Sequence, residues 1–479
     1  MTAPTPTRLL VAGEWIAAEA TFPVFDPAAG VLIADVANAG AAETRRAIDA
    51  ADAVRDRWAA TPAPARFEIL QRAVSLLRER EESIAHLIVR ETGKPLAEAR
   101  GEIRNSLRFF DFFSHETLRL PGQYWPGVLA DRDAFVVLEP VGIVGAITPW
   151  NFPAFMVACK VGAALAAGCP VVLKPAEQTP LTALAIAEAF VDAGLPAGVL
   201  SVLPTNSPAG VGDVLLSDPR VACVTFTGST AVGQRLLAGA APGVKRMLLE
   251  LGGNAPVIIT GDADLAAVVP QVVRARYANA GQACVAANRV YVDEHVVDEF
   301  LAHFVPAVKN LRVGDPWHGD TDLGPLIDRA AVERLEDQVA RATSSGGDLV
   351  TGGRRLRDTA TSAFVEPGVM TLGGDADVLR EEVFGPVASV VVTTSDEEAV
   401  RLANDSLYGL SAFVFSGDDS RARRIAERIR SGNVGVNCAL VSEPALPFGG
   451  VGLSGLGRER GRIGVEEFLE SKTIQVARR

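Results

Sequence analysis

VACVTFTGSTAVG, residues 221–233, joins a run of small and β-branched residues to a glycine-containing turn and the start of a helix. The run predicts a buried strand over 221–226, and a helix is expected to begin after Ser229. Gly228 lies in the turn and Gly233 in the first helical turn, so bare backbone N–H groups and the helix dipole suit a phosphate there. Taken alone this pattern is weak, because a glycine pair before a helix is often only a tight turn.

The sequence before this turn already alternates between short apolar runs and helical patterns. Strands are expected at 170–174 and 199–204, and helices at 182–194 and 208–216. Such alternation is typical of a parallel sheet covered by helices on both faces. The segment therefore favours a dinucleotide-binding half.

A second alternating series begins after Asn254 and predicts another α/β domain, which ends near 450. The first hundred residues are instead dominated by helical periodicity, as at 65–80. Gly and acidic residues mark 313–325 and 345–353 as surface turns. The elements expected in the second series are strands at 255–260 and 288–293 and helices at 264–278 and 294–310.

Length and charge exclude several classes of protein. A chain of 479 residues exceeds the size of one growing core, so two or three domains are expected. A net charge of −12 argues against nucleic acid as a partner. The N-terminus has no cationic start followed by an apolar run, and the longest apolar stretch, 161–173, is shorter than the ~20 residues that span a bilayer. A cytoplasmic protein with no membrane partner is expected.

The five cysteines lack paired spacing, which fits a reducing compartment, and the five histidines lack metal-ligand spacing, so no metal site is expected. Cys169, Cys223 and Cys438 lie in apolar or strand-like sequence and are interpreted as buried structural thiols. Cys284 is different, because its neighbours in ANAGQACVAANRV, residues 278–290, are small or polar. This composition favours space for a ligand over packing.

Two further stretches also follow predicted strands, TPWNFP at 148–153 and VVLKPAEQTP at 171–180. Ligands of open α/β sheets bind outside the carboxyl ends of strands, so these segments can converge on one crevice. Lys174 alone is more often a solvated lysine, and Glu177 more often a turn or cap residue. Together, a cation and a carboxylate three residues apart could bind the hydroxyls of an adenosine ribose.

Seven motifs, in this order, resemble the aldehyde dehydrogenase superfamily from about residue 10 to the C-terminus: PWNFP, KPAEQTP, FTGST, LELGGN, GQACV, EEVFGPV and PFGGVGLSGLGRERG. The resemblance implies an α/β fold with a Rossmann-like parallel-sheet cofactor domain and a second α/β catalytic domain. A small β oligomerisation hairpin would make a homodimer or homotetramer. The implied regions are 1–117 and 141–252 for NAD binding, 253–452 for catalysis, and 118–140 with 453–479 for oligomerisation.

The resemblance also implies roles for individual residues. Cys284 would be the nucleophile, Glu250 the general base, and Asn151 the side-chain donor of an oxyanion hole. The residues implied for NAD are Trp150, Lys174, Glu177, Gly228, Ser229, Gly233, Glu382 and Phe384.

These roles agree with the chemistry of the residue types. A free thiol has a pKa of ~8.5, and a dry pocket lowers its thiolate fraction further. Attack on an aldehyde gives a thiohemiacetal, loss of hydride gives a thioester, and a carboxylate such as Glu250 can activate the water that releases the acid. NAD is expected to be preferred over NADP, because Glu177 would repel a 2′-phosphate.

The expected substrate follows from the positions at which this sequence departs from the family pattern. The chain looks most like succinate-semialdehyde dehydrogenases, which bind the substrate carboxylate with two arginines, but Cys159 and Ala278 stand at those positions. Gly452 stands where relatives often have lysine. We therefore expect an uncharged aromatic or medium-chain aldehyde; the alternatives are a semialdehyde acid, a CoA-acylating enzyme, or an inactive structural relative. The expected pocket lining is Phe152, Phe155, Met156, Cys159, Val285, Ser442 and Phe448.

Overall fold

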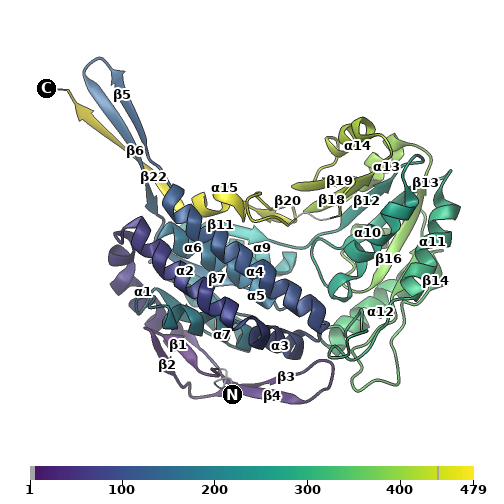
Figure 1. The fold of residues 1–479 in the computed structure, drawn as a ribbon, viewed down its shortest axis with the longest axis horizontal. Coiled ribbons are helices and arrows are strands. Elements are labelled where there is room, and N and C mark those ends of the chain that lie inside the picture. Colours follow the sequence, from purple (N-terminus) through teal and green to yellow (C-terminus); the bar gives the residue numbers. More distant parts are fainter. Residues whose placement is uncertain (1–5, 440–441, 479) are drawn as a thin grey trace.

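The computed structural model describes residues 6–439 and 442–478, which form two large sheets with helices packed around them and a projecting β arm (Figure 1). The first sheet has the strand order β2-β1-β9-β8-β7-β10-β11-β21. Its five central strands are parallel, whereas β1, β2 and β21 are antiparallel additions at the edges. The central strands are β7 (Ile143–Ile147), β8 (Val171–Lys174), β9 (Leu200–Val202), β10 (Val221–Thr227) and β11 (Arg246–Glu250).

The central strands are almost entirely buried, as expected where helices cover both faces of a parallel sheet. The helices that connect them begin at prolines or at a capped residue, and the two whose ends were predicted, at 194 and 216, end at Asp192 and Ser217. This arrangement confirms the Rossmann-like half. The connecting helices are α7 (Pro180–Asp192), α8 (Pro208–Ser217) and α9 (Thr230–Ala240).

The second sheet has the order β14-β15-β16-β13-β12-β18-β19, and only β14 runs antiparallel to its neighbour. The predicted turn at 345–353 is wrong in part, because residues 348–351 form β14, an edge strand too short and too exposed to show a pattern. The strands are β12 (Ala255–Ile259), β13 (Ala287–Asp293), β14 (Asp348–Thr351), β15 (Gly368–Thr371), β16 (Val387–Thr393), β18 (Ser411–Phe415) and β19 (Asn433–Val436).

Five helices accompany the second sheet: α10 (Leu265–Tyr277), α11 (Val297–Lys309), α12 (Arg329–Ser344), α13 (Asp396–Ala403) and α14 (Asp419–Ala426). Cys438 lies beyond the end of β19 and is exposed, so its interpretation as a buried structural thiol is wrong. Cys169 and Cys223 are buried. Together the two sheets confirm the expected α/β fold class with a Rossmann-like parallel sheet.

The N-terminal region is helical only from residue 41 onward. The expectation of a mainly helical first hundred residues is wrong for 9–37, where four strands of three to six residues are too short to show periodicity. The strands are β1 (Leu9–Val11), β2 (Glu14–Ile16), β3 (Thr21–Phe25) and β4 (Leu32–Ala37), and the helices are α1 (Ala41–Ala59), α2 (Ala63–Glu79), α3 (Glu81–Thr92) and α4 (Leu96–Glu116).

A three-stranded arm extends from the body of the molecule and carries the C-terminus toward its tip (Figure 1). It consists of β5 (Gln123–Leu129), β6 (Arg132–Pro140) and β22 (Leu469–Ala477), and β22 pairs with β6 along its whole length. Every residue of β5 is exposed. Large apolar side chains exposed on the arm are Tyr124, Trp125, Val128, Leu129, Phe135, Ile474 and Val476.

The remaining short elements connect the sheets near the carboxyl ends of the central strands. An α-helix, a π-helical turn and a second α-helix form one continuous buried segment after β7: α5 (Pro153–Val157), Ala158–Gly162 and α6 (Ala163–Ala167). Near the C-terminus lie β17 (Tyr408–Gly409), β20 (Val451–Gly452), β21 (Gly455–Leu456) and α15 (Gly461–Glu466). In the described ranges, none of the helices combines the length and the apolar character needed to cross a membrane.

Candidate active site

Cys284 lies in a loop that the rest of the protein holds in an unusual shape. The residues before it, Asn279, Ala280 and Gly281, have positive φ of 53°, 53° and 71°. A left-handed Ala is unfavourable, so outside contacts must hold the loop. The Asn279 backbone N–H donates to the Glu98 carboxylate at 3.0 and 3.1 Å, and the Gln282 Oε1 accepts from the Ile327 N–H at 2.9 Å.

The Cys284 thiol is protonated at rest. Desolvation raises its pKa to about 12, the Glu250 and Glu382 carboxylates add to the rise, and Arg460 opposes it. The residue itself is partly exposed, so a ligand can still approach. A nucleophile in this state needs a nearby base at the moment of attack.

Glu250 ends β11 and is buried beside Cys284. Its Oε2 has no hydrogen-bond partner among the described residues, and its pKa lies well above the usual value because of burial first and repulsion by Glu459 second, with Lys160 acting in the opposite direction. A Cβ on Gly449 would lie 3.0 Å from the Glu250 Oε1, so the PFGG segment packs against this carboxylate. A buried carboxyl with a raised pKa is a typical general base.

Three of the predicted motifs meet at Gly253. A Cβ at this position would lie 1.9 Å from the Cys284 carbonyl oxygen, so only glycine allows the LELGGN loop to approach the cysteine loop. The Gly253 N–H donates to the Glu382 Oε1 at 3.0 Å. Burial raises the pKa of Glu382 to about 7.

Asn151 is fixed against the cysteine loop by its side chain and by its backbone. Its Nδ2 donates to the Gln282 carbonyl at 3.0 Å, which leaves the second N–H of that amide for another acceptor. The Asn151 carbonyl accepts from the Lys94 Nζ at 2.8 Å, and Lys94 pairs with Glu102 at 2.6 Å in a buried ion pair. The amide that the sequence assigned to an oxyanion hole therefore lies beside the nucleophile.

Five of the residues predicted for the cofactor lie at or just beyond the carboxyl ends of β8 and β10: Lys174, Glu177, Gly228, Ser229 and Gly233. A Cβ on Gly228 would lie 2.4 Å from the Phe226 ring, and one on Gly233 would lie 2.4 Å from Leu251, so both glycines permit close packing where α9 begins. The Ser229 Oγ caps α9 and accepts from the Val232 N–H at 3.4 Å.

A buried cation and an aromatic pair complete this side. Lys174 is buried, which lowers its pKa, and its Nζ lies 3.3 Å from the Glu177 Oε2. The rings of Trp150 and Phe384 meet edge to face with centroids 5.7 Å apart. A glycine-lined helix start, a Lys–Glu pair, and a buried carboxylate at Glu382 form a donor and acceptor set that fits a dinucleotide.

The predicted substrate residues gather around a side chain that was not predicted, Arg460. Its guanidinium carbon lies 3.7 Å from the centroid of the Phe448 ring and 5.0 Å from that of Phe155. Its Nη1 donates to the Ser442 Oγ at 3.3 Å, and its charge partly offsets the burial that raises the pKa of Cys159 to about 12. Four of the seven predicted lining residues are thus brought together.

The other three lie on the same segments. The Phe152 ring lies 4.2 Å from the Lys94 Nζ, Met156 is buried one helical turn after Phe152, and Val285 is half-buried next to Cys284. Gly452 pairs with Tyr408 in β20 and has φ +60°, a conformation that lysine adopts only with strain.

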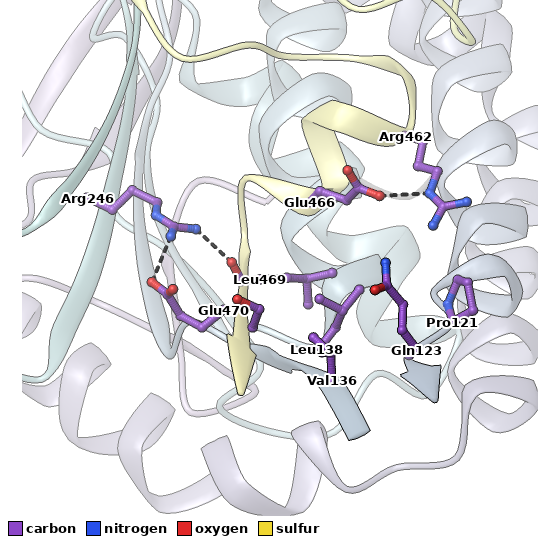
Figure 2. A pocket seen from close by; sticks show the side chains of 11 residues that line it. Pro121, Gln123, Val136, Leu138, Arg246, Arg462, Glu466, Leu469 and Glu470 are labelled. Atoms are coloured by element: carbon purple, nitrogen blue, oxygen red, sulfur yellow. Dashed lines mark hydrogen bonds and ion pairs between the residues drawn. The ribbon is translucent and has the colours of Figure 1, made fainter. Parts of the chain in front are cut away.

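A cavity of about 350 Å³ lies elsewhere, between the base of the arm and α15. Figure 2 shows two ion pairs in its wall, Arg246 with Glu470 and Arg462 with Glu466. None of the predicted catalytic or cofactor residues lines it. Across the described residues, no cluster of three His, Cys, Asp or Glu side chains is arranged to hold a metal ion.

Sequence reasoning missed the residues that support the site: Lys94, Glu98, Glu102, Asn279, Gln282 and Arg460. Gln282 and Asn279 lie within the quoted cysteine segment and could have been noticed. Lys94 and Glu102 carry no local signal, because their function depends on α4 lying beneath Asn151. Arg460 lies in the last motif, where one arginine of two gives no indication of burial.

Comparison with known proteins agrees with this geometry. Residues 15–474 match the aldehyde dehydrogenase family. The mitochondrial succinate-semialdehyde dehydrogenase of Arabidopsis thaliana is 45% identical over 98% of this chain and 89% of its own length. The NADP(+) succinate-semialdehyde dehydrogenase GabD of Escherichia coli is 42% identical over 97% of this chain and 96% of its own length.

A solved structure gives the same result for the fold. The crystal structure of succinate-semialdehyde dehydrogenase from Burkholderia pseudomallei superposes with a TM-score of 0.97 at 46% identity, covering 100% of this chain and 99% of that chain. These matches confirm the resemblance to succinate-semialdehyde dehydrogenase-like members. They favour the semialdehyde alternative over the uncharged aldehyde that Cys159 and Ala278 predicted. Because the relatives include a mitochondrial and a bacterial protein, the cytoplasmic location stays a prediction.

Proposed function

The chain belongs to the aldehyde dehydrogenase family, and we propose that it oxidises an aldehyde that carries a terminal carboxylate, such as succinate semialdehyde, to the corresponding diacid. The observation that carries this proposal is the meeting of Cys284, Glu250 and Asn151 in a chain 42–46% identical to proteins named for that substrate. The proposal replaces the uncharged aromatic or medium-chain aldehyde that we expected from the sequence.

The first step belongs to Cys284. Because its thiol is protonated at rest, attack on the aldehyde carbon requires transfer of the thiol proton to a base, and Glu250 lies close enough to influence its pKa. Attack forms a carbon–sulfur bond and places negative charge on the former carbonyl oxygen. The Cys284 N–H and the second N–H of the Asn151 amide supply the two donors for this oxyanion.

Oxidation of the adduct needs a hydride acceptor. The residues around Gly228, Lys174 and Glu382 fit a nicotinamide dinucleotide, which supplies that acceptor when bound. Ser229 and the first N–H groups of α9 would hold its pyrophosphate, Lys174 and Glu177 its adenosine ribose, and Glu382 the second ribose. Gly233, Trp150 and Phe384 would line the same cofactor site.

Release of the acid belongs to Glu250. Once Glu250 has lost the thiol proton to solvent, a water gives it a proton and bonds to the thioester carbon, the carbon–sulfur bond breaks, and the Cys284 sulfur takes up that proton as the acid leaves. The buried Oε2 of Glu250 has no partner in the described structure and is free to accept this hydrogen bond. A hydrolytic base beside the thioester disfavours the CoA-acylating alternative, in which water must be excluded. The presence of Cys284, Glu250 and Asn151 in one site likewise disfavours an inactive structural relative.

We propose that NAD is preferred over NADP, although one relative is named for NADP(+). The Glu177 carboxylate accepts a hydrogen bond from a ribose 2′-hydroxyl, whereas it repels a 2′-phosphate. Lys174 already pairs with Glu177 at 3.3 Å, so its charge does not fully compensate a second anion.

The arm formed by β5, β6 and β22 supports a homodimer or homotetramer. Its exposed aromatic and aliphatic side chains, among them Tyr124, Trp125 and Phe135, would be buried by another copy of the chain. Sedimentation of the purified protein tests this assignment, and a monomer at micromolar concentration would contradict it. We further propose the division into a cofactor domain, a catalytic domain and this oligomerisation region.

The substrate proposal is tested by steady-state oxidation of succinate semialdehyde, benzaldehyde and hexanal with NAD, read as NADH absorbance. We expect kcat/KM for succinate semialdehyde to exceed the other two by more than tenfold. Values within threefold of one another, or a reversed order, would restore the uncharged aldehyde as the substrate.

A further inference from the structure

Arg460 is buried in a backbone conformation that arginine rarely adopts. Only 5% of the residue is exposed, and its φ of 63° and ψ of 171° fall in a region that is essentially restricted to glycine. Non-glycine residues remain in such regions where the surrounding structure imposes them, most often at functional sites. The position of this side chain therefore requires an explanation.

The hydrogen bonds of this guanidinium are incomplete. Arginine has five N–H donors; among the residues that the structure describes, Nη1 donates one long bond to the Ser442 Oγ at 3.3 Å, the guanidinium interacts with the Cys159 thiol, and Nε has no partner. In the part of the chain that the structure describes, no carboxylate forms an ion pair with Arg460. The neighbouring acid, Glu459, is already paired with Lys160. A buried charge without an anion is unfavourable unless a ligand supplies one.

The surroundings of Arg460 are those of the proposed substrate pocket. Phe448, Phe155 and Phe109 contact the guanidinium at 3.7, 5.0 and 5.6 Å from their ring centroids. Attraction to these rings stabilises the charge but does not supply the oxygen acceptors that the N–H donors of the guanidinium require. Cys159, which led us to expect an uncharged aldehyde, lies against the same cation.

We propose that Arg460, together with the Ser442 hydroxyl, binds the terminal carboxylate of the aldehyde substrate. This inference rests on the proposed function and names the residue that makes the substrate acidic. A planar fork of N–H donors binds the two oxygens of a carboxylate, and the aromatic wall excludes water that would weaken the pair. The cation comes from the segment before α15 rather than from position 159 or 278.

The test compares succinate semialdehyde with its methyl ester, methyl 4-oxobutanoate, which has nearly the same shape and no charge. In the wild type we expect kcat/KM for the acid to exceed that for the ester by at least tenfold. Arg460→Gly removes the cation and suits the backbone conformation, so the variant should fold. It should lose about tenfold to a hundredfold on the acid, mainly through KM, and less than threefold on the ester.

Arg462→Met is the matched control, because it removes a neighbouring arginine that is exposed and paired with Glu466 at 2.8 Å. It should leave both substrates unchanged. A second measurement uses succinate as a probe: calorimetry should show binding to the wild type and to Arg462→Met, and at least tenfold weaker binding to Arg460→Gly.

The outcomes separate this inference from the proposed function. A wild type that prefers the acid, with the preference retained in Arg460→Gly, would leave the proposed function standing and overturn the role of Arg460. An equal loss on acid and ester would also overturn it, since Arg460 would then act only on Cys284 and Glu250 or on folding. A wild type that does not prefer the acid would overturn the proposed substrate and this inference together.

Discussion

The two sides of the active site are built in different ways. The cofactor side is made mainly of the turns that directly follow β8 and β10, each supplied by one short stretch of sequence, and Trp150 after β7 and the Glu382–Phe384 loop complete it. The substrate side is made of side chains from four separate segments, at Cys159, Cys284, Ser442–Phe448 and Arg460. The shape of the backbone specifies the first side, whereas the second can change its chemistry without any change of fold.

Two buried cations, one paired with Glu459 and one next to it in the sequence, show the same contrast. The Lys160 Nζ is paired with Glu459 and hydrogen-bonded to the Thr225 Oγ1 at 3.1 Å, so its donors are used inside the protein. Arg460 follows Glu459 directly, and within the described part of the chain it donates one long hydrogen bond. Lys160 therefore joins β10 of the first sheet to the last motif, whereas the N–H donors of Arg460 stay available to a ligand.

The largest expected effect concerns the residues shared by both sides. Glu250→Gln should show a burst of NADH up to one per site, followed by turnover slowed at least about a hundredfold, because the amide cannot accept a proton from water. Rapid mixing measures the burst, and mass spectrometry should find the acyl group on Cys284. Cys284→Ala should show neither burst nor adduct.

The pH dependence of the burst in the same variant tests whether Glu250 is also the base for the Cys284 thiol. If Glu250 also deprotonates the thiol, the burst in Glu250→Gln should slow and recover at higher pH, where the thiolate forms unaided. In the wild type, turnover should rise with pH, because burial raises the pKa of Glu250 and its ionised fraction grows only above the usual carboxyl range. Near-normal turnover in Glu250→Gln would exclude Glu250 as the base.

The next largest effect tests whether the backbone at Gly253 must be free of a side chain for the Cys284 loop to keep its position. Gly253→Ala would place a Cβ 1.9 Å from the Cys284 carbonyl oxygen, so the cysteine loop must move. We expect a loss of about a hundredfold in kcat/KM, the scale associated with small misplacement of a reacting group. Gly210→Ala in α8 is the control, because its Cβ would meet nothing within 4 Å and activity should stay unchanged. Full activity of Gly253→Ala would show that the loop adapts.

The sequence predicts the parts of the site that lie in one contiguous motif and not the parts that are brought together from separate segments. Gly228, Lys174 and the strands before them were predicted correctly in position, because each motif is contiguous and follows a predicted strand. Arg460 was missed, since its burial depends on Phe448 and Phe155 from other segments. Lys94, which supports Asn151 from the connection between α3 and α4, was missed for the same reason.

A smaller effect tests the cofactor side by itself. Glu177→Ser should narrow the preference for NAD over NADP by about tenfold or more, because the variant no longer repels the 2′-phosphate and frees Lys174 from its 3.3 Å pair. The ratio of kcat/KM for the two cofactors is the measurement, with succinate semialdehyde held at saturation. Equal use of both cofactors by the wild type would contradict the role of Glu177.

The smallest expected effect is the change in melting temperature of Arg460→Gly. This measurement distinguishes an arginine that stabilises the fold from one that binds a ligand. Arg460→Gly removes a strained backbone conformation that costs about 1–3 kcal/mol in a non-glycine residue. It also loses stacking on Phe448 worth about 0.5–2 kcal/mol, and the two contributions nearly cancel. The melting temperature without ligand should therefore change by only a few degrees. Added succinate should raise the melting temperature of the wild type and not that of the variant, because the anion stabilises only the chain that binds it. A structural arginine would give the opposite pattern, with a large fall in melting temperature in Arg460→Gly and the same response to succinate in both proteins.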